Sequence, residues 1–377
     1  MSSIAIDVGG TYVKAATLNR GKVGTVHRFP IPAFLVNAQG RETESRSREI
    51  DPLQLDAVVF RALNEVAGGG ILGSTIYISG QMAGLAYTDD LGNALAPLIT
   101  WQDSRFRRVE QVRHEIGPPE CARLGDGLRI GSPVVTLSEH GRPDGSFVTS
   151  MINYVAGRVS GFRAPVIHVT DAAALGLLDT VSGKWSRRAC KTARVSSSKL
   201  PEVVDELRPL TEAVSVYTPI ADQQASLLGA GLRPNWLSIN LATGCQVSVL
   251  TNDFPSSGQV RPYFGEQYGG RFLRTVTHLP AGRGLAAALV AARGFEDWDW
   301  LNSAEGEGFP AFEEISCAIN EAASKLEARG LPVAFSGGLV QNLPHLREKI
   351  LASLGKPEWV MFSGDDAALA GLARLAD

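Results

Sequence analysis

The strongest indication of the fold comes from the segment Ser3-Ile-Ala-Ile-Asp7-Val-Gly-Gly10-Thr-Tyr-Val-Lys14. Apolar residues alternate up to Asp7, two glycines follow, and the chain from Tyr12 to Leu18 is again apolar and β-competent. This pattern predicts a tight hairpin with a carboxylate at the end of its first strand. For the Gly-Gly pair taken alone, an ordinary hairpin with a capping aspartate is the better interpretation, but the full Asp-x-Gly-x-Thr-x-x-Lys spacing points beyond it.

The turn also carries the groups that a phosphate site needs. Gly9 and Gly10 lack a Cβ, so their backbone amides can approach an anion closely, and Thr11 and Lys14 add a hydroxyl and an ammonium group. An aspartate beside such a turn suits Mg²⁺, which binds a few carboxylates together with waters and phosphate oxygens. We therefore expect phosphate contacts at the turn and metal binding at Asp7.

Helices and strands alternate through the first half. Asp51-Pro52 gives an N-cap and an N1 proline, apolar residues then recur at helical spacing, and Gly68-Gly69-Gly70 stops the helix. A strand from Ile76 to Ser79 follows at once. This order, with short glycine-rich turns, predicts an α/β domain around a central sheet.

The same strand–turn–strand unit returns in the second half. Leu237–Leu241 precedes Thr243-Gly244, and Gln246–Leu250 resumes the strand pattern. The turn fits phosphate binding, although many hairpins carry Thr-Gly for turn geometry alone. Gly337-Gly338 follows the strand Val333–Phe335 and lets a flat ligand such as adenine pack against backbone, so replacing Gly337 is expected to weaken nucleotide binding. A plain strand-to-helix turn explains the two glycines nearly as well. Further helices are expected across Phe312–Leu326, Leu343–Leu354 and Asp366–Leu375.

Composition narrows the function. The 377 residues exceed what one core usually supports, which predicts two domains. A formal net charge of -3 with interleaved signs gives no footprint for nucleic acid or an anionic membrane. The apolar stretch Leu285–Ala292 is too short for a membrane span, and the N-terminus shows no secretion signal, so a cytoplasmic protein is expected. Four widely spaced cysteines indicate buried free thiols.

Taken together, the motifs resemble those of the FGGY family of carbohydrate kinases, most of all its sedoheptulose kinase branch, in a compact form. The resemblance spans nearly the whole chain, and the motifs stand in the order found in the family. They are Asp7–Lys14, Ser79–Met82, Ile99–Arg105, Thr170–Ala173, Leu178-Asp179, Gly183–Trp185, Ile220–Ala225, Ala242–Gly244, Gly337-Gly338 with Asn342, and Asp365–Ala368 with Gly371.

The resemblance implies a fold, an activity and a set of roles. The fold is α/β, of the actin-like ATPase or ribonuclease H-like type, with two domains and a central cleft. A sugar-binding domain is expected over residues 1–217 and a nucleotide-binding domain over 218–377. The implied cofactors are ATP and Mg²⁺. Asp222 is the expected general base, and the sugar is expected against Gln81, Met82, Trp101, Asp103, Arg105 and Asp222. ATP is assigned to Gly9, Gly10, Thr11, Lys14, Thr243, Gly244, Gly337, Gly338 and Asn342.

Each role has a structural alternative. Asp222 would also serve as a helix N-cap for Gln223–Leu228. Without the flanking motifs, Trp101 is a core residue and Asp103 with Arg105 is a surface ion pair. Chemistry agrees with the catalytic role of Asp222, because phosphoryl transfer depends mainly on positioning and charge stabilisation.

Substrate and activity keep open alternatives. Ala83 stands where many xylulose kinases of the family carry histidine, and the segment after Leu250 is shorter than usual. The expected acceptor is the terminal primary hydroxyl of a ketose, with sedoheptulose ahead of xylulose and ribulose. Thr100–Arg105 and an aromatic-glycine stretch, Arg261–Phe264 with Gly269–Phe272, resemble the sedoheptulose kinase branch. A polyol kinase, or a non-catalytic sugar-sensing relative on the same fold, are the alternatives.

Overall fold

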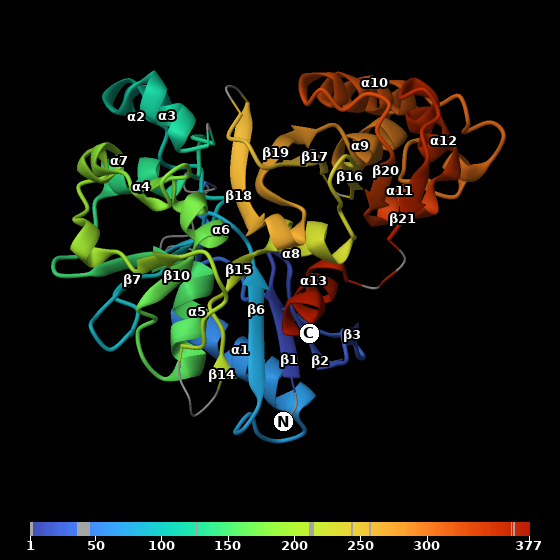
Figure 1. Cartoon of the computed structure of the whole chain (residues 1–377). Helices are drawn as coiled ribbons and strands as arrows, with labels where there is room; N and C mark the ends of the chain where they lie inside the picture. Colours follow the sequence, from blue (N-terminus) through green and yellow to red (C-terminus); the bar gives the residue numbers. More distant parts are fainter. Residues whose placement is uncertain are drawn as a thin grey trace. The chain divides into compact units, whose positions relative to one another are not determined.

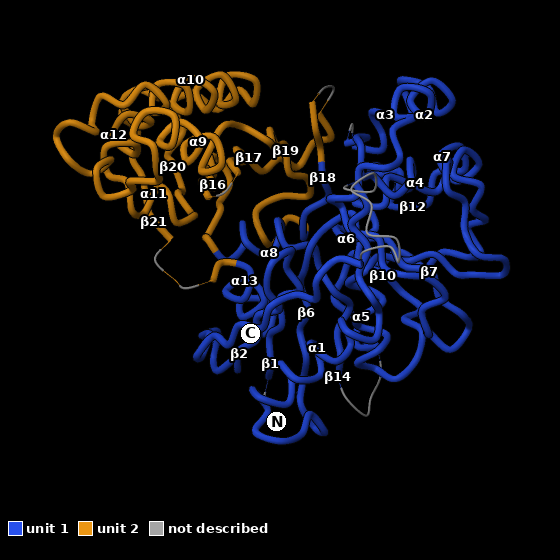
Figure 2. Tube along the Cα trace, turned by 180° about the vertical axis from the view of Figure 1, so that it is seen from behind, with its two compact units in different colours: residues 1–229, 261–264, 368–377 blue, residues 230–260, 265–367 orange. Residues whose placement is uncertain are grey.

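The computed structural model describes residues 3–35, 46–125, 127–210, 215–242, 244–255, 258–362, 364 and 366–377. These residues form two compact units, coloured separately in Figure 2. The first unit comprises 1–229, 261–264 and 368–377, and the second comprises 230–260 and 265–367. The division between the compact units thus comes later in the chain than the boundary expected at 217/218. Two later segments, 261–264 and 368–377, also belong to the first unit.

The first unit is built on the sheet that the opening stretch predicts. Strands β1 (Ser3–Val8) and β2 (Tyr12–Asn19) form the antiparallel hairpin, and β6 (Thr75–Gly80) lies parallel to β1 on its other side (Figure 1). The remaining strands of this sheet are β3 (Lys22–Val23), β4 (His27–Pro30), β14 (Ser215–Val216) and β15 (Ile220–Ala221). Apolar side chains of β1 and β6 pack in one core with helices α1 (Pro52–Ala67) and α5 (Met151–Ser160).

The predicted caps of α1 are confirmed. Asp51 accepts a hydrogen bond from the Leu53 backbone N–H at 2.9 Å, Pro52 begins the helix, and Gly68 ends it with φ of 68°. Such left-handed backbone favours glycine, because a Cβ would crowd the neighbouring carbonyl.

A second sheet and several short helices complete the first unit. The sheet runs in the order β5 (Glu49–Ile50), β8 (Leu98–Ile99), β7 (Leu85–Thr88), β9 (Phe147–Ser150). The other helices are α2 (Val109–Ile116), α3 (Pro118–Arg123), α4 (Pro133–His140), α6 (Val169–Ala172), α7 (Arg187–Thr192), α8 (Asp222–Gly229) and α13 (Ala367–Ala376). Two small strand pairs are β10 (Val166–His168) with β13 (Glu202–Val204), and β11 (Leu178–Asp179) with β12 (Lys184–Trp185).

The second unit repeats the strand arrangement of the first. Strands β16 (Leu237–Leu241) and β17 (Cys245–Thr251) form an antiparallel hairpin, and β20 (Val333–Ser336) lies parallel to β16, as β6 does to β1. Its sheet also contains β18 (Gln259–Gly265), β19 (Gly270–Leu279) and β21 (Trp359–Met361). The helices are α9 (Gly282–Arg293), α10 (Pro310–Lys325), α11 (Gly338–Asn342) and α12 (Pro344–Ser353). The repeat predicted from the sequence is confirmed.

Two expectations from composition can be compared with the described residues. No described helix combines the length and the apolar character that crossing a bilayer requires. All four cysteines are free, but the expectation that they are buried is wrong for one of them. Cys317 is exposed, because it lies on the outer face of α10, where its thiol contacts Glu313 one turn earlier.

The C-terminal helix α13 packs against α8 through a glycine. A Cβ built on Gly371 would lie 1.9 Å from the carbonyl oxygen of Ala225, which is backbone and cannot rotate away. We predict that Gly371→Ala lowers the free energy of unfolding by about 1–3 kcal/mol, the usual cost of overpacking a core. Calorimetric unfolding measures it. Gly70→Ala is the control, because a Cβ at Gly70 meets nothing within 4 Å; equal melting of the two variants would contradict the packing.

Candidate active site

The register of β1 with its two neighbours builds the first part of the site. Asp7 lies opposite Lys14 across the hairpin and beside Ser79 of β6. The Lys14 ammonium is 3.3 Å from Asp7 Oδ2, and the Ser79 hydroxyl donates to Oδ1 at 2.9 Å. The Asp7 side chain is buried, so these two partners hold its charge where little water reaches it.

Asp222 enters the same end of the sheet from another strand. β15 pairs with the last residues of β6, with Ala221 beside Gly80, and α8 begins at Asp222 itself. Asp222 is thus the first helical residue, and its Oδ1 accepts a hydrogen bond from the Gln223 N–H at 2.8 Å. A carboxylate at this position interacts favourably with the helix dipole. The helix-start alternative and the catalytic assignment are therefore compatible in geometry.

The environment of Asp222 favours its protonated form. Burial and the charge of Asp7 raise the pKa of the half-buried Asp222 carboxyl to about 7, although Gln223, Arg261 and Lys14 act to lower it. Removing a carboxylate from water and placing a second carboxylate nearby both disfavour ionisation. A carboxyl with a pKa near neutrality is well matched to proton transfer.

A second buried carboxyl lies behind Asp222. Thr170 of α6 accepts a hydrogen bond from the Ala221 N–H at 3.3 Å, which ties α6 to the strand that carries Asp222. The neighbouring Asp171 is fully buried and accepts a hydrogen bond from the Ser150 hydroxyl. Burial and the charge of Asp222 raise its pKa to about 7, although the hydrogen bond from Ser150 acts to lower it. Thr170 therefore helps to position the residue expected to act as the base.

Gln81 and Met82 follow β6 directly. The Gln81 side-chain amide donates to the carbonyl of Gly9 at 3.3 Å, and its backbone N–H donates to Val8 at 2.9 Å. Gln81 thereby holds the backbone at the start of the Gly9-Gly10 turn. The Met82 sulfur is 3.4 Å from Nη1 of Arg261. The structure brings both residues to the end of the sheet where Asp7 and Asp222 meet.

Hydrogen bonds and ion pairs hold the segment from Trp101 to Arg105 in place. Asp103 accepts hydrogen bonds from the N–H of Arg48 at 2.9 Å and from the N–H and Nε of Arg105 at 3.1 Å and 3.0 Å. Arg105 also reaches Glu49 at 2.6 Å. Burial alone would lower the pKa of Arg105, but hydrogen bonds to Asp103 and Glu49 raise it. The ion pair is therefore present but, on the Asp103 side, buried instead of superficial.

Trp101 lies near the Gly9-Gly10 turn. A Cβ built on Gly10 would be 3.9 Å from both the Trp101 indole nitrogen and the Gln102 amide nitrogen. The two motifs are far apart in sequence but adjacent in the first unit. Gly10 and Thr11 are exposed, so their backbone is accessible to a ligand.

In the second unit, the candidate nucleotide residues follow β16 and β20 in the chain. Thr243 lies outside the described residues; Gly244 is exposed and begins the return into β17. Gly337 has φ of 99°, and a Cβ there would lie 2.3 Å from the Leu241 carbonyl. The reason given for the expected effect of replacing Gly337 is therefore wrong: a side chain would meet protein backbone before any ligand. Gly338 differs, because its Cβ would meet only Asn342, at 4.0 Å.

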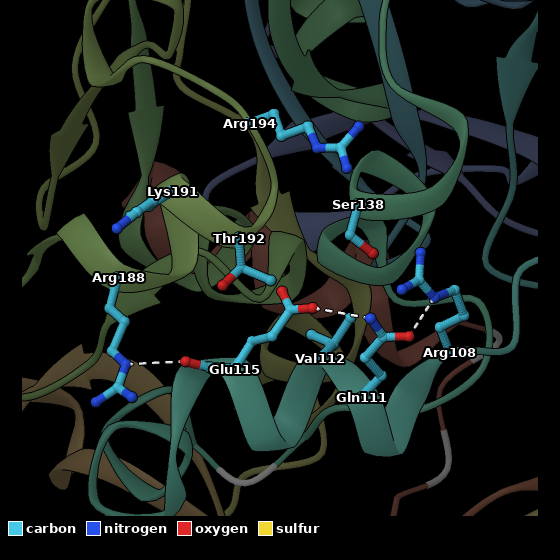
Figure 3. Close-up of a pocket in the computed structure, with 9 residues that line it drawn as sticks. All are labelled: Arg108, Gln111, Val112, Glu115, Ser138, Arg188, Lys191, Thr192 and Arg194. Carbon is cyan, nitrogen blue, oxygen red and sulfur yellow. Dashed lines mark hydrogen bonds between the residues drawn. The ribbon is translucent and has the colours of Figure 1, made fainter.

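A cavity of about 490 Å³ opens elsewhere in the first unit, among α2, α4 and α7 (Figure 3). Its polar side chains bond largely to one another: Arg108 to Gln111, Gln111 to Glu115, and Arg188 to the Glu115 carbonyl. None of the site residues expected from the sequence lines it. The cavity does not contribute to the arrangement around Asp222.

Three charged residues of the site were not assigned a role from the sequence. Asp171 was noted only as part of a motif, Arg261 only as part of an aromatic-glycine stretch, and Arg129 not at all. Arg129 precedes α4 and its guanidinium lies over the Trp101 ring, 5.7 Å from the centroid. No local pattern could have found it, since a single arginine before a helix has no chemical signature of its own.

Comparison with solved structures establishes the fold. A xylulose kinase from Brucella ovis superposes with a TM-score of 0.81 at 17% identity, covering 100% of this chain and 90% of that one. Glycerol kinase from Plasmodium falciparum with ADP gives a TM-score of 0.77 at 14% identity, covering 99% and 88%. The chain has the actin-like ATPase fold of the sugar kinases, as the resemblance implied.

Sequence comparison finds distant relatives of the same class. A xylulose kinase of Staphylococcus xylosus is 24% identical over 293 residues, which are 69% of this chain and 58% of that protein. A glycerol kinase of Cereibacter sphaeroides is 26% identical over 175 residues, or 41% and 36% of the two chains. The matched stretches thus span about half the length of these relatives, or less. No protein-family model matches the chain.

The pKa of Asp222 gives the site a pH signature. In the folded state the Asp222 carboxyl stays protonated up to about pH 7, whereas in the unfolded chain an aspartate loses its proton at about pH 3.9. The free energy of unfolding therefore falls as the pH rises between these two values. We predict that Asp222→Asn, without divalent metal, becomes more stable relative to the wild type from pH 5.5 to 8. Thermal unfolding midpoints measure this, with the exposed Asp90→Asn as control; a constant difference across this range would contradict the raised pKa.

Proposed function

We propose that this chain transfers the γ-phosphoryl group of ATP to a hydroxyl of a small polyhydroxylated compound, with Asp222 as the general base. The observation that carries the proposal is the Asp222 carboxyl at the end of the sheet, beside Asp7 and Lys14, with its pKa raised to about 7. The similarity to xylulose and glycerol kinases supports the same reaction class.

The chemistry follows from the groups at the end of the sheet. Asp222 accepts the proton of the acceptor hydroxyl as the hydroxyl oxygen attacks the γ-phosphorus, and the bond to ADP breaks. Lys14 and the backbone of Gly9, Gly10 and Thr11 hold phosphate oxygens. Gln81 keeps this turn in place through its bond to Gly9.

Magnesium fits the same carboxylates. Among the described residues, no group of three or more His, Cys, Asp or Glu side chains is arranged around a metal position. Asp7 and Asp222 are nevertheless close enough for one charge to raise the other's pKa, and Mg²⁺ usually takes only one or two carboxylates together with phosphate oxygens and waters. Asp7 would hold the ion, which supplies charge neutralisation of the phosphates when bound.

ATP is assigned to residues of the second unit in addition to Gly9, Gly10, Thr11 and Lys14 of the first unit, and the acceptor is assigned to the first unit. Thr243, Gly244, Gly337, Gly338 and Asn342 are the proposed ATP residues of the second unit. This assignment keeps the functional division expected from the sequence, with sugar binding in 1–217 and nucleotide binding in 218–377. A cytoplasmic location belongs to the same proposal.

The acceptor site is proposed around Met82 and Trp101. Trp101 offers an apolar face to the C–H side of a sugar, and it lies beside Gly10 of the phosphate turn. Asp103 and Arg105 are proposed as positioning residues, because the oxygens of Asp103 already accept hydrogen bonds from three N–H groups of Arg48 and Arg105. This changes their expected role from direct sugar contact to holding the Trp101 segment against Glu49.

Substrate identity is the finer part of the proposal. The stretches Thr100–Arg105 and Tyr263–Phe272 favour sedoheptulose ahead of xylulose and ribulose, whereas the relatives found by comparison are xylulose and glycerol kinases. The values of kcat/KM for sedoheptulose, xylulose, ribulose and glycerol rank these four compounds as substrates. A sugar-sensing protein without activity is the second candidate, favoured if ATP binds and no acceptor is phosphorylated.

We predict that Asp222→Asn slows turnover by roughly 10²-fold or more and leaves ATP binding nearly intact, because the variant keeps its shape but cannot accept the proton. Coupled ADP release measures turnover, and calorimetry measures ATP binding. Asp90→Asn, which removes a carboxylate from an exposed turn, is the matched control. Turnover within a few-fold of the wild type would exclude Asp222 as the base.

Gly338→Val tests the nucleotide assignment. A Cβ at Gly338 meets only Asn342, at 4.0 Å, so we expect the second unit to stay folded while ATP binds roughly tenfold or more weakly, about 1.4 kcal/mol. Gly337→Val is the contrasting variant and should lower the melting temperature, since its Cβ meets the Leu241 carbonyl. An unchanged ATP affinity in folded Gly338→Val would place adenine elsewhere.

A further inference from the structure

The cavity among α2, α4 and α7 is lined by more positive than negative charge. Four cationic side chains line it (Figure 3): Arg108, Arg188, Lys191 and Arg194. Among its described lining residues, Glu115 is the one carboxylate. Four positive charges against one negative charge leave an excess of three, which a neutral ligand would not balance.

These four cations have no ion-pair partner within the described ranges of the chain. Carboxylates are near, but they have other partners. Glu110 of α2 pairs with Arg113 at 3.6 Å, and Glu139 of α4 accepts a hydrogen bond from the backbone N–H of Arg108 at 2.6 Å. Like charges gathered around one cavity repel each other, so the cavity favours an anionic ligand.

Arg188 is held in the cavity wall by backbone. Its Nε donates to the Glu115 carbonyl at 3.0 Å, and its guanidinium lies against Gly117. A Cβ built on Gly117, whose φ is 84°, would be 3.3 Å from Cζ and from both terminal nitrogens of Arg188. Within the described residues, these two nitrogens make no hydrogen bond. A fixed guanidinium with two donors in one plane suits a phosphoryl or carboxylate group.

Arg194 takes a backbone conformation that usually belongs to glycine. It follows α7 with φ of 55°, its N–H donates to the Lys191 carbonyl at 3.1 Å, and the Val195 N–H donates to the Cys190 carbonyl at 2.9 Å. Glycine is the usual residue at this point of such a helix end, because a side chain there strains the backbone. The same bonds satisfy the last carbonyls of α7, so the helix end does not require Lys191 and Arg194 as donors. The side chains of both residues instead line the cavity.

Size and charge indicate the class of ligand. The cavity of about 490 Å³ lies in the range of small-molecule sites, about 300–1,000 Å³. None of its described lining residues is aromatic, so a nucleobase finds no surface for stacking. At neutral pH two phosphoryl groups carry a charge of about -3 to -4, and three carboxylates carry about -3. Either set balances the excess of three positive charges.

We propose that this cavity binds a small organic polyanion with three or four negative charges, carried by phosphoryl or carboxylate groups, at a site separate from the candidate active site. Arg188 and Lys191, three residues apart on α7, hold one anionic group. Arg108, on the other side of the cavity in Figure 3, holds a second, and Arg194 adds to the positive charge. The inference does not depend on the proposed phosphoryl transfer, because none of the residues assigned to that reaction lines the cavity.

Matched pairs of anions test the ligand class and distinguish its two sources. Calorimetry at about 0.15 M salt measures the Kd of D-glucose 1,6-bisphosphate against D-glucose 6-phosphate, and of propane-1,2,3-tricarboxylate against pentanedioate. In at least one pair, we expect the more highly charged member to bind roughly tenfold or more tightly, since the site holds three excess charges. The pair with the larger ratio identifies the ligand as a phosphate ester or a polycarboxylate.

Neighbouring arginines provide matched variants. Arg188→Met and Arg108→Met remove a cation that lines the cavity and should weaken binding of the preferred polyanion roughly tenfold or more. Arg187→Met and Arg107→Met remove an exposed cation one residue away that does not line it. These two controls should keep the wild-type Kd within about threefold, because exposed charges outside a site contribute little. If Arg188→Met does not fold, Lys191→Met replaces it.

The outcomes decide where the polyanion binds. Equal weakening by all four arginine variants would indicate general attraction to a basic surface and would overturn the inference, as would the lack of binding by any polyanion. Lys14→Met should bind the polyanion normally; loss of binding in this variant alone would place the anion at the Gly9-Gly10 turn and overturn the inference as well. A polyglutamate peptide that binds more tightly than every small anion would assign the cavity to an acidic protein instead. Each measurement is made without ATP or acceptor, so failure here leaves the proposed kinase function untouched.

Discussion

The pairing of β1 with β6, and of β6 with β15, is the constraint on which the candidate site depends. It brings Asp7 and Asp222, which are far apart in sequence, to one end of one sheet. Two carboxylates in such a place repel each other and lose water, so the fold must offset that cost. Lys14, the Ser79 hydroxyl and the start of α8 offset part of it. The part that is not offset leaves the pKa of Asp222 raised.

Contacts of neighbouring segments also help to fix the position of Asp222. Thr170 holds the strand before it, and the glycine at 371 lets α13 approach α8 more closely than any other residue would permit. These supports come from residues before and after Asp222 in the chain. A base that must meet a hydroxyl within hydrogen-bonding distance benefits from such packing, because small displacements are costly in rate.

Glycines carry two different duties in this chain. At Gly337 and Gly371 they permit backbone segments to meet, so their replacement would disturb the fold itself. At Gly10 and Gly338 the surrounding protein leaves room for a Cβ, so packing does not require glycine there. The role left for these two glycines is to keep the backbone accessible. The distinction cannot be drawn from sequence, where all four lie in similar glycine-containing motifs.

The sequence by itself determined the local elements and much of the chemistry. Alternating apolar residues around Gly9-Gly10, and again around Gly244, predicted both hairpins, and Asp51-Pro52 predicted the start of α1, because these signals act between near neighbours. Tertiary structure alone decided which charges meet. It paired Asp103 with Arg105 and Glu49, and it left Arg129 and Arg261 beside Trp101 and Gln223. The physical reason is that burial and charge balance depend on strand register and on contacts between distant segments, which no local pattern records.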